Sequence, residues 1–156
     1  MTDTMQLIID TANEHLPIFL KEHEAYLNGE KGAYISVLDT VHTTGMHISG
    51  EIIGIVPKAK LTGRMTNAIE KIIRLYRRVE IEGYAECTSM VTQDYAASKY
   101  GGGIRTISGM YGAASTFPPL YDTLFMAEVF LKCKVIEDAE FKVIMEEAQM
   151  YENPGT

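Results

Sequence analysis

The chain has 156 residues, of which 46% are hydrophobic and 22% charged, and its formal net charge is −7. This balance is typical of one soluble globular domain, here residues 1–156, and the negative charge argues against nucleic-acid binding. No apolar run approaches the roughly 20 residues that span a bilayer. The acidic N-terminus also lacks the basic and apolar regions of a signal peptide.

The N-terminal segment, from Asp3 to Leu27, has apolar residues at helical spacing, which predicts a helix. Pro17 lacks a backbone donor and crowds the preceding turn, so we expect it to kink or divide this helix. The polar residues 28–32, which include two glycines, then end it.

Residues 33–56 are rich in β-branched side chains and contain a turn signal at Thr44-Gly45, which predicts a β-hairpin. A two-residue loop at that signal pairs Val41 with Ile48. In this register one face of the hairpin is apolar and is expected to face the core. That face carries Ile35, Val37, Val41, Ile48 and Ile52.

The middle of the chain predicts a helix and further strands. Pro57 precedes an amphipathic pattern that runs from about Lys58 to Val79 and predicts a second helix. Residues 84–92 alternate loosely and predict a strand. Residues 104–114 predict another strand, or a tight strand pair around Ser108-Gly109.

The C-terminal third predicts two helices. Ser115 or Thr116 is expected to be the N-cap of a third helix that includes Pro118-Pro119 and runs to about Val135. This helix is apolar nearly all round, so we expect it to be buried in the domain or in an oligomer interface. A final amphipathic helix begins at residues 137–138. The order α-β-β-α-β-β-α-α favours an α+β fold with helices packed on a mainly antiparallel sheet.

Two histidines are expected to meet in the hairpin. The predicted register places His42 directly opposite His47, with Cβ atoms about 4.5–5.5 Å apart. Such a pair could share a metal ion, with Asp39 or Glu51 as a third ligand, or could form a proton-sensitive pair. The alternative is two polar residues on a solvated hairpin tip. We keep His42 and His47 as candidate metal ligands.

The second predicted helix carries half of the lysines and arginines of the chain. Arg64, Lys71, Arg74 and Arg78 fall on one stripe of this helix. The stripe could bind an anionic ligand, a phosphate or an acidic partner. The alternative is a solvated helix face that pairs with the excess carboxylates.

A glycine triplet, residues 101–103, precedes Arg105 and matches neither a Walker A pattern nor a dinucleotide fingerprint. Three glycines allow positive φ and close approach of the backbone to a neighbour or a ligand; the alternative is a plain loop. The start of the third helix offers free backbone amides to an anion, and Arg105 could lie close to it. The candidate ligand-binding residues are Tyr100, Gly102, Gly103, Arg105, Ser115 and Thr116.

The two cysteines, Cys87 and Cys133, match no metal or redox spacing, so we expect reduced thiols in a cytoplasmic protein. No histidine can be paired with Cys87 from the sequence, and Cys133 lies in an apolar helix. We therefore expect neither cysteine to be a nucleophile.

One segment carries a family resemblance. It contains Gly-Gly-x-Ile-Arg, a short β segment with glycines, Gly-Ala, Ser, a proline-bearing helix start, Asp and Ala-Glu. This order resembles the C-terminal part of the haem-binding HbpS/GlcG-like family, and the α-β-β-α beginning is also similar. The resemblance implies a small oligomeric α+β protein that binds haem or another small ligand, without identifying a ligand residue. It rests on Gly102, Gly103, Ile104, Arg105, Gly112, Ala113, Ser115, Pro118, Pro119, Asp122, Ala127 and Glu128.

Three functional hypotheses remain open. The first is a cytoplasmic, homo-oligomeric ligand-binding or sensory protein for haem or another small anionic ligand. The second is a protein-interaction scaffold, because the element order also resembles roadblock/profilin-like scaffolds and the third helix is a plausible interface. The third is a small metal- or histidine-dependent enzyme that uses His42 and His47.

Overall fold

The computed structural model of the protein describes residues 1–43 and 46–152. Its elements follow the predicted order and form an α+β fold, which confirms the predicted fold class. The helices are α1 (Asp3–His23), α2 (Leu61–Tyr76), α3 (Pro119–Lys132) and α4 (Asp138–Met150). The strands are β1 (Lys31–Asp39), β2 (Ile48–Ile55), β3 (Gly103–Arg105) and β4 (Met110–Ser115).

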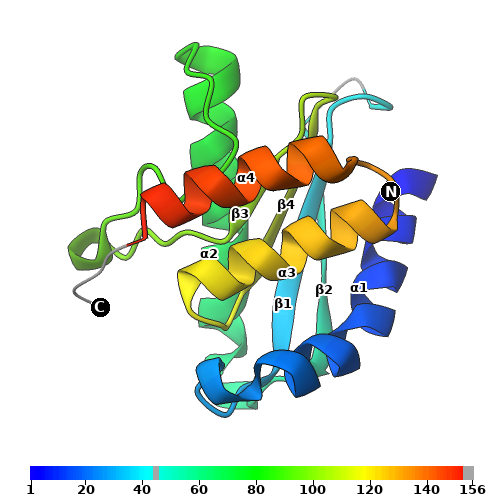
Figure 1. Ribbon diagram of the computed structural model, residues 1–156, viewed down its shortest axis with the longest axis vertical. Helices are drawn as coiled ribbons and strands as arrows, with labels where there is room; N and C mark the ends of the chain where they lie inside the picture. Colours follow the sequence, from blue (N-terminus) through cyan, green and yellow to red (C-terminus); the bar gives the residue numbers. More distant parts are fainter. Residues whose placement is uncertain (44–45, 153–156) are drawn as a thin grey trace.

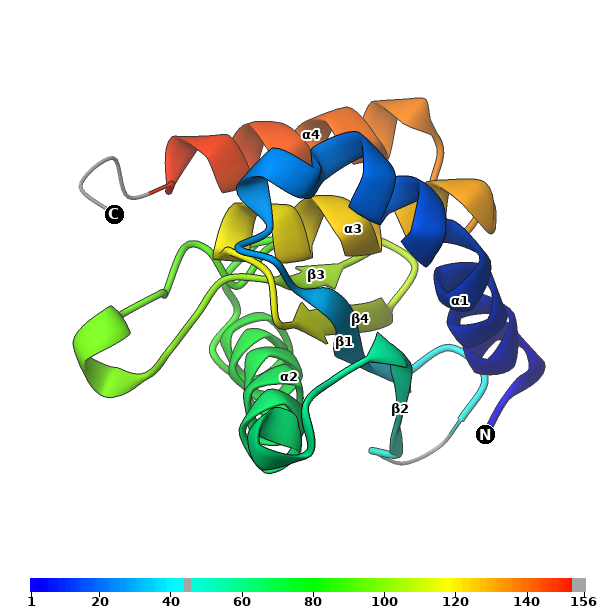
Figure 2. The same cartoon turned by 90° about the horizontal axis from the view of Figure 1, so that it is seen from below.

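The strands form one antiparallel sheet in the order β2-β1-β4-β3. Helices α1 and α3 cover one face of this sheet, and α4 packs against α3. Helix α2 covers the opposite face, so the molecule has helices on both sides of a central sheet (Figures 1 and 2). Both central strands, β1 and β4, are therefore buried on their two faces.

Alternate side chains of strand β1 pack on opposite faces of the sheet. Ile35 and Val37 pack in the apolar cluster that α1 and α3 share. Ser36 points to the other face, where its hydroxyl donates a hydrogen bond to the backbone oxygen of Ala68 on α2 at 3.1 Å. Because neighbouring strand residues alternate between faces, this single polar side chain lies against α2 and not in the larger core.

Helix α1 is continuous and includes Pro17. Figure 1 shows its axis turning part-way along, as expected for a helix with an internal proline. The turn keeps the apolar side of α1 against the sheet and α3 along its whole length. The residues buried on that side are Met5, Ile8, Ile9, Ala12, His15, Leu16 and Phe19.

The predicted hairpin register is wrong. Leu38 pairs with Ile48 in the ladder, three residues earlier on β1 than expected. As β1 ends at Asp39, His42 and His47 lie outside the paired strands. The predicted turn residues, Thr44-Gly45, lie outside the described residues.

Asp39 explains why β1 stops early. Its buried carboxylate accepts the backbone N–H groups of Val41 at 2.8 Å and His42 at 3.0 Å, and the hydroxyl of Thr2 at 2.7 Å. Burial alone would raise the pKa of Asp39, but these hydrogen bonds outweigh it and lower the pKa. Val41 and Ile52, which were expected in the core, are consequently 49% and 41% exposed.

The predicted strand over residues 84–92 is also wrong. In the described chain this segment contributes only an isolated bridge between Thr88 and Ile104 of β3. The carboxylate of Glu147 on α4 accepts the backbone N–H groups of Cys87 at 3.1 Å and Thr88 at 2.8 Å, so these donors are not available to a ladder. The predicted tight strand pair is confirmed as β3 and β4.

Helix α3 begins later than predicted. Ser115 belongs to β4, and Pro118 is the cap residue with Pro119 at the first helical position, so the predicted N-cap at Ser115 or Thr116 is wrong. The apolar surface of α3 is covered by the sheet, α1 and α4 within the chain itself. Across the residues described, no helix combines the length and apolar character needed to cross a membrane.

Candidate functional site

A buried ion pair joins α2 to α3. Lys71 Nζ donates to Asp122 Oδ2 at 3.1 Å and to the backbone oxygen of Ala114 at 2.6 Å. Both residues are only 2% exposed. The carboxylate of Asp122 also accepts the backbone N–H groups of Phe117 at 3.0 Å and Thr116 at 3.4 Å. Asp122 therefore reaches back from the first turn of α3 and binds two backbone donors of the loop before the helix.

Burial pushes both groups of this pair toward their uncharged forms. Loss of solvation raises the pKa of Asp122 to about 6, although the charge of Lys71 and the hydrogen bonds to the carboxylate oppose the shift. Burial lowers the pKa of Lys71, and the attraction of Asp122 opposes that shift in turn. Fully buried lysines are rare unless paired, and strongly shifted pKa values cluster at functional sites.

The pair lines a cavity of about 270 Å³, which we call the Lys71 cavity. Its polar lining comes from α2, from the end of β4 and the loop after it, from the first turn of α3, and from the segment before β3. These polar residues are Arg64, Asn67, Lys71, Tyr100, Ser115, Thr116 and Asp122. Three of the predicted ligand-binding residues, Tyr100, Ser115 and Thr116, are thus brought together here.

Positive charge exceeds negative charge around the Lys71 cavity. Arg64 Nη2 and Lys60 Nζ both approach Glu30 Oε1, at 3.2 and 3.4 Å. Of these three residues only Arg64 lines the cavity, and the other charged lining residues among those described are Lys71 and Asp122. Two cations, Arg64 and Lys71, therefore line the cavity with one carboxylate, Asp122, which leaves a formal net charge of about +1 on its lining.

The glycine triplet packs against the ion pair. Gly102 has a φ of +123°, and a Cβ there would lie 2.7 Å from Asp122 Cβ and 2.8 Å from Lys71 Nζ. A Cβ on Gly103 would lie 3.2 Å from both Lys71 Cβ and Ser89 Oγ. The predicted close approach of backbone to a neighbour is confirmed, and the neighbour is the Lys71–Asp122 pair.

The basic stripe of α2 is not a solvated face at its centre, where Lys71 and Arg74 are 2% and 9% exposed. The guanidinium of Arg74 donates to the backbone oxygens of Ser89 and Tyr100 and pairs with Glu70 at 2.7 Å. Arg74 thus fixes the backbone beside the Lys71 cavity.

Arg105 lies elsewhere. Its Nε donates to the backbone oxygen of Glu86 at 2.8 Å, and its side chain lines a second cavity of about 750 Å³. This α4 cavity lies beside α4 and the loop before it, has a more apolar lining, and shares no lining residue with the Lys71 cavity. Its lining includes Cys87, Ile107, Ile136, Val143, Ile144 and Glu147.

Both cysteines are free thiols. Burial, together with the nearby carboxylate of Glu147, raises the pKa of Cys87 to about 12. Burial also raises the pKa of Cys133. Both groups therefore stay protonated near neutral pH, which makes them poor nucleophiles and poor metal ligands.

His42 is not paired with His47. His42 Nδ1 lies 2.8 Å from Asp39 Oδ2, and its side chain is 56% exposed. The corrected register removes the cross-strand geometry on which the predicted metal pair depended. In the part of the chain that is described, the one group of three potential metal-ligating side chains within ligand distance includes neither histidine.

The sequence did contain a signal for the ion pair. Lys71 lies three residues after Ala68 and four residues before Leu75, so it shares a helix face with two side chains that are buried against the sheet. A charged residue at a core-facing position requires a buried partner. Asp122, in the first turn of an apolar helix, was available as that partner, yet nothing local links it to Lys71.

Comparisons of the chain with protein-family models, with curated proteins and with solved structures find no match. The resemblance of residues 100–131 to the HbpS/GlcG-like family therefore stays a prediction. Any functional conclusion for this chain rests on the geometry of its own residues.

Proposed function

We propose that the protein binds a small organic anion in the Lys71 cavity. The observation that carries this proposal is the buried Lys71–Asp122 pair in the cavity wall. A buried ion pair is often no more stabilising than apolar residues of similar volume, so stability alone gives little reason to keep one. A cavity with a few convergent polar groups and shifted pKa values is the default hypothesis for a binding site.

Charge and free donors support an anion as the ligand. Arg64 and Lys71 exceed Asp122, the one carboxylate of the described lining, by one charge, which an anion neutralises. The guanidinium of Arg64 can bind a carboxylate or a phosphate with two hydrogen bonds. Asn67 and Tyr100 also line the cavity, and among the described residues neither side chain forms a hydrogen bond with the protein.

The volume of the cavity limits the ligand. At about 270 Å³ it lies just below the roughly 300–1,000 Å³ of sites for drug-sized ligands, so we propose a metabolite smaller than haem or a nucleotide. The α4 cavity is larger, but its described lining contains no histidine, methionine or tyrosine, and its cysteine, Cys87, stays protonated because burial raises its pKa to about 12. Haem is therefore a less supported ligand than a small carboxylate or phosphate ester.

The test compares variants of Arg64 and Lys60, the two cations that pair with Glu30. We would screen small carboxylates and phosphate esters for a rise in melting temperature and measure the affinity of the best by calorimetry. Arg64→Gln should weaken binding at least about 10-fold because it removes the bidentate contact. Lys60→Gln is the matched control, since it also loses a Glu30 contact but does not line the cavity. Equal losses in both variants, or no ligand below about 1 mM, would contradict the proposal.

A second candidate function is self-association through β2. This strand lies at the edge of the sheet, and its sequence contains no lysine, arginine or proline to block pairing with another strand. Ile52 and Ile55 on it are 41% and 73% exposed. Two copies of an edge strand can pair antiparallel about a two-fold axis, so we propose a second copy of this chain as the partner.

Size-exclusion chromatography with light scattering tests the dimer. Ile52→Glu should convert a dimer to a monomer, because it places a charge in the paired edge. Ile107→Glu, at a residue that is 83% exposed in the β3–β4 turn, is the control and should leave the mass unchanged. A monomeric wild-type protein at about 100 µM would exclude this second function.

A further inference from the structure

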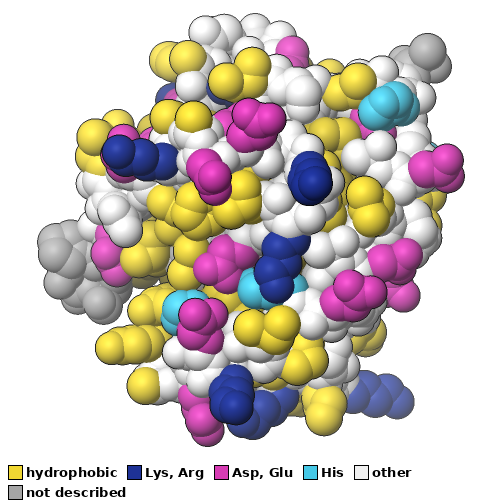
Figure 3. All heavy atoms as spheres, turned by 45° about the vertical axis from the view of Figure 1, so that its right-hand side comes forward, with side chains coloured by type: hydrophobic (Ala, Val, Ile, Leu, Met, Phe, Trp, Pro, Cys, Tyr) yellow, Lys and Arg dark blue, Asp and Glu magenta, His cyan; other side chains and the backbone are white. Residues whose placement is uncertain are grey.

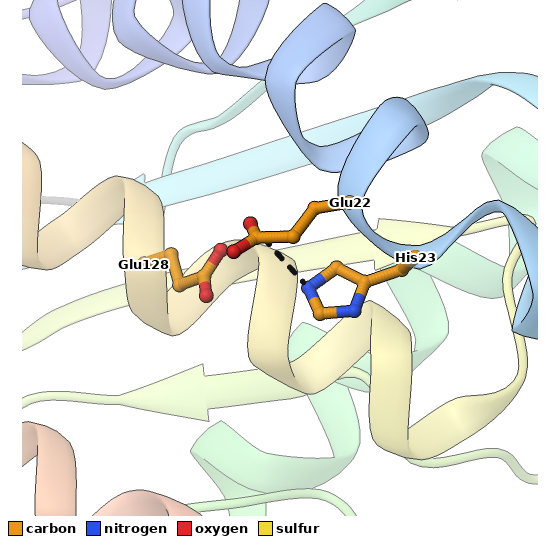
Figure 4. Close-up of side chains that lie close together, drawn as sticks. All are labelled: Glu22, His23 and Glu128. Carbon is orange, nitrogen blue, oxygen red and sulfur yellow. Dashed lines mark ion pairs between the residues drawn. The ribbon is translucent and has the colours of Figure 1, made fainter.

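The C-terminal end of α1 and the middle of α3 bring histidines and glutamates together. Glu22 and His23 are the last residues of α1, and Glu128 projects toward them from α3 (Figure 4). The ligating atoms of these three side chains all lie within 4.8 Å of one another. Figure 3 shows histidine and acidic side chains close together near the middle of the face of the molecule that it draws. With His15, which contacts Glu128, they form what we call the α1–α3 cluster.

Two members of the cluster are held in place. His15 Nε2 lies 2.8 Å from Glu128 Oε1, and the His15 ring is 4% exposed and stacks on Phe125 at 5.7 Å. The ring of His23 lies 4.6 Å from Phe19, so its orientation is also restricted. A hydrogen bond from a buried histidine to a carboxylate is the arrangement that orients metal-ligating carboxylates.

His23 has a free ring nitrogen in this cluster. Nε2 of His23 is shielded from solvent and has no hydrogen-bond partner among the described residues, and its nearest carboxylate oxygen is Glu22 Oε2 at 3.8 Å. A shielded polar atom without a partner is destabilising. An imidazole nitrogen in that position is available to coordinate a metal ion.

The charges of the cluster also favour a bound cation. Glu22 and Glu128 carry like charges within 4.8 Å of each other. Through the described chain neither has a lysine or arginine partner, and each forms an ion pair only with a histidine. A divalent cation between the carboxylates replaces their repulsion with two attractions.

We propose that Glu22, His23 and Glu128 bind one Zn²⁺ ion, with His15 as a positioning residue for Glu128. One imidazole nitrogen and two carboxylate oxygens are common zinc ligands, and three protein ligands leave a fourth position for water. Ligands of a tetrahedral zinc ion lie roughly 3.4 Å apart, so the site must contract slightly. Glu22 allows this because its side chain is 60% exposed and can rotate inward. The ion would link α1 to α3, and its site shares no residue with the Lys71 cavity.

The experiment titrates metal-free protein with Zn²⁺ by calorimetry and measures the melting temperature with Zn²⁺ and with EDTA. Wild-type protein should bind about one equivalent, and its melting temperature should rise with Zn²⁺. Glu22→Gln should lower the affinity at least about 10-fold while leaving the metal-free melting temperature nearly unchanged, because Glu22 is exposed. Glu128→Gln should lower the Zn²⁺ affinity by a similar factor, and its amide oxygen can still accept a hydrogen bond from His15.

Matched controls separate this site from general acidic surface. Glu24→Gln removes a neighbouring exposed carboxylate outside the cluster and should bind Zn²⁺ like the wild type. His42→Gln with His47→Gln removes the histidine pair predicted from the sequence and should also bind normally. Binding below about 0.2 equivalents, full binding by Glu22→Gln, or loss of binding in the His42/His47 variant would each overturn the proposal.

Discussion

The two faces of the central sheet bury different kinds of side chain. On the face that α1 and α3 cover, β1 and β4 contribute Ile35, Val37 and Ala114 to a large apolar cluster. On the face that α2 covers, the apolar cluster is small, and buried polar groups lie around it. Among these are Ser36, Lys71, Arg74 and, through its hydroxyl bonded to Glu80, Tyr111.

We expect this difference between the two faces to separate the residues that mainly determine stability from those that also determine binding. Apolar burial is non-directional and stabilises in proportion to the area removed from water. Buried polar groups stabilise only when each finds a partner, so they fix particular geometries. The Lys71 cavity borders the polar face. There the glycine segment packs against Lys71, which binds the backbone oxygen of Ala114, and Arg74 binds the backbone oxygen of Tyr100 beside that segment. We therefore expect core changes on the apolar face to act on stability and changes on the α2 face to act on binding as well.

The largest effect is expected on the apolar face. Phe130 is fully buried, and its ring lies where a Cβ on Gly112 would meet it at 2.8 Å. Phe130→Ala should therefore lower the free energy of unfolding by about 3–5 kcal/mol, measured by urea denaturation. Val143→Ala, at a side chain that is 58% exposed, is the control and should change it by less than about 0.5 kcal/mol. A loss below about 1 kcal/mol at Phe130 would remove the distinction between the two faces.

A smaller effect is expected from breaking the ion pair. Lys71→Met keeps the volume but leaves Asp122 buried without its cation. Removing one partner of a buried pair typically costs about 3–5 kcal/mol, but Asp122 can take up a proton, so we expect about 2–3 kcal/mol at pH 7. Lys71→Met combined with Asp122→Asn should recover most of the loss, because the amide oxygen still accepts the Phe117 N–H group. A double variant no more stable than the single one would contradict this account.

The protonation of Asp122 gives a prediction in pH. Burial raises its pKa from an ordinary 3.8 to about 6, so the folded state holds this proton more tightly than the unfolded state. The contribution of Asp122 to stability is therefore most favourable below about pH 4 and is lost as the pH rises through about 6. Carboxyl ¹³C NMR should show Asp122 titrating near pH 6, and Lys71→Met should raise that value, because the lysine charge opposes the shift. Titration at an ordinary pKa would show that the pair is solvated.

Local patterns predicted the helices and the order of elements well. In α4, for example, Ile144, Met145 and Ala148 recur at helical spacing and all are buried. The hairpin register failed because the turn signal at Thr44-Gly45 says nothing about the carboxylate of Asp39, which captures two backbone N–H groups and ends the strand. The strand expected over residues 84–92 failed because Glu147, far along the chain, binds its donors.

The candidate sites depend on contacts that no local pattern contains. Lys71 and Asp122 are 51 residues apart, and His15 and Glu128 are 113 apart. The sequence indicated part of the first site, since Tyr100, Ser115 and Thr116 were expected near a ligand. It also grouped Arg105 with them, although β3 directs Arg105 to the other cavity. Residue types and spacing could therefore nominate polar residues at buried positions, whereas the pairing between them required the tertiary fold.

The smallest expected effect concerns a thiol beside the apolar cluster. Cys87 is partly buried against that cluster, and burial raises its pKa to about 12, with Glu147 adding to the shift. In a Cys133→Ser background, alkylation of Cys87 at pH 8 should be at least about 100-fold slower than that of a free thiol. Glu147→Gln should increase the rate by less than about 10-fold, because desolvation, and not the carboxylate, is the main cause of the shift. Alkylation of the wild-type residue at the rate of a free thiol would mean that the segment around Cys87 opens readily. The apolar side of the sheet would then be less closed near α4 than its packing indicates.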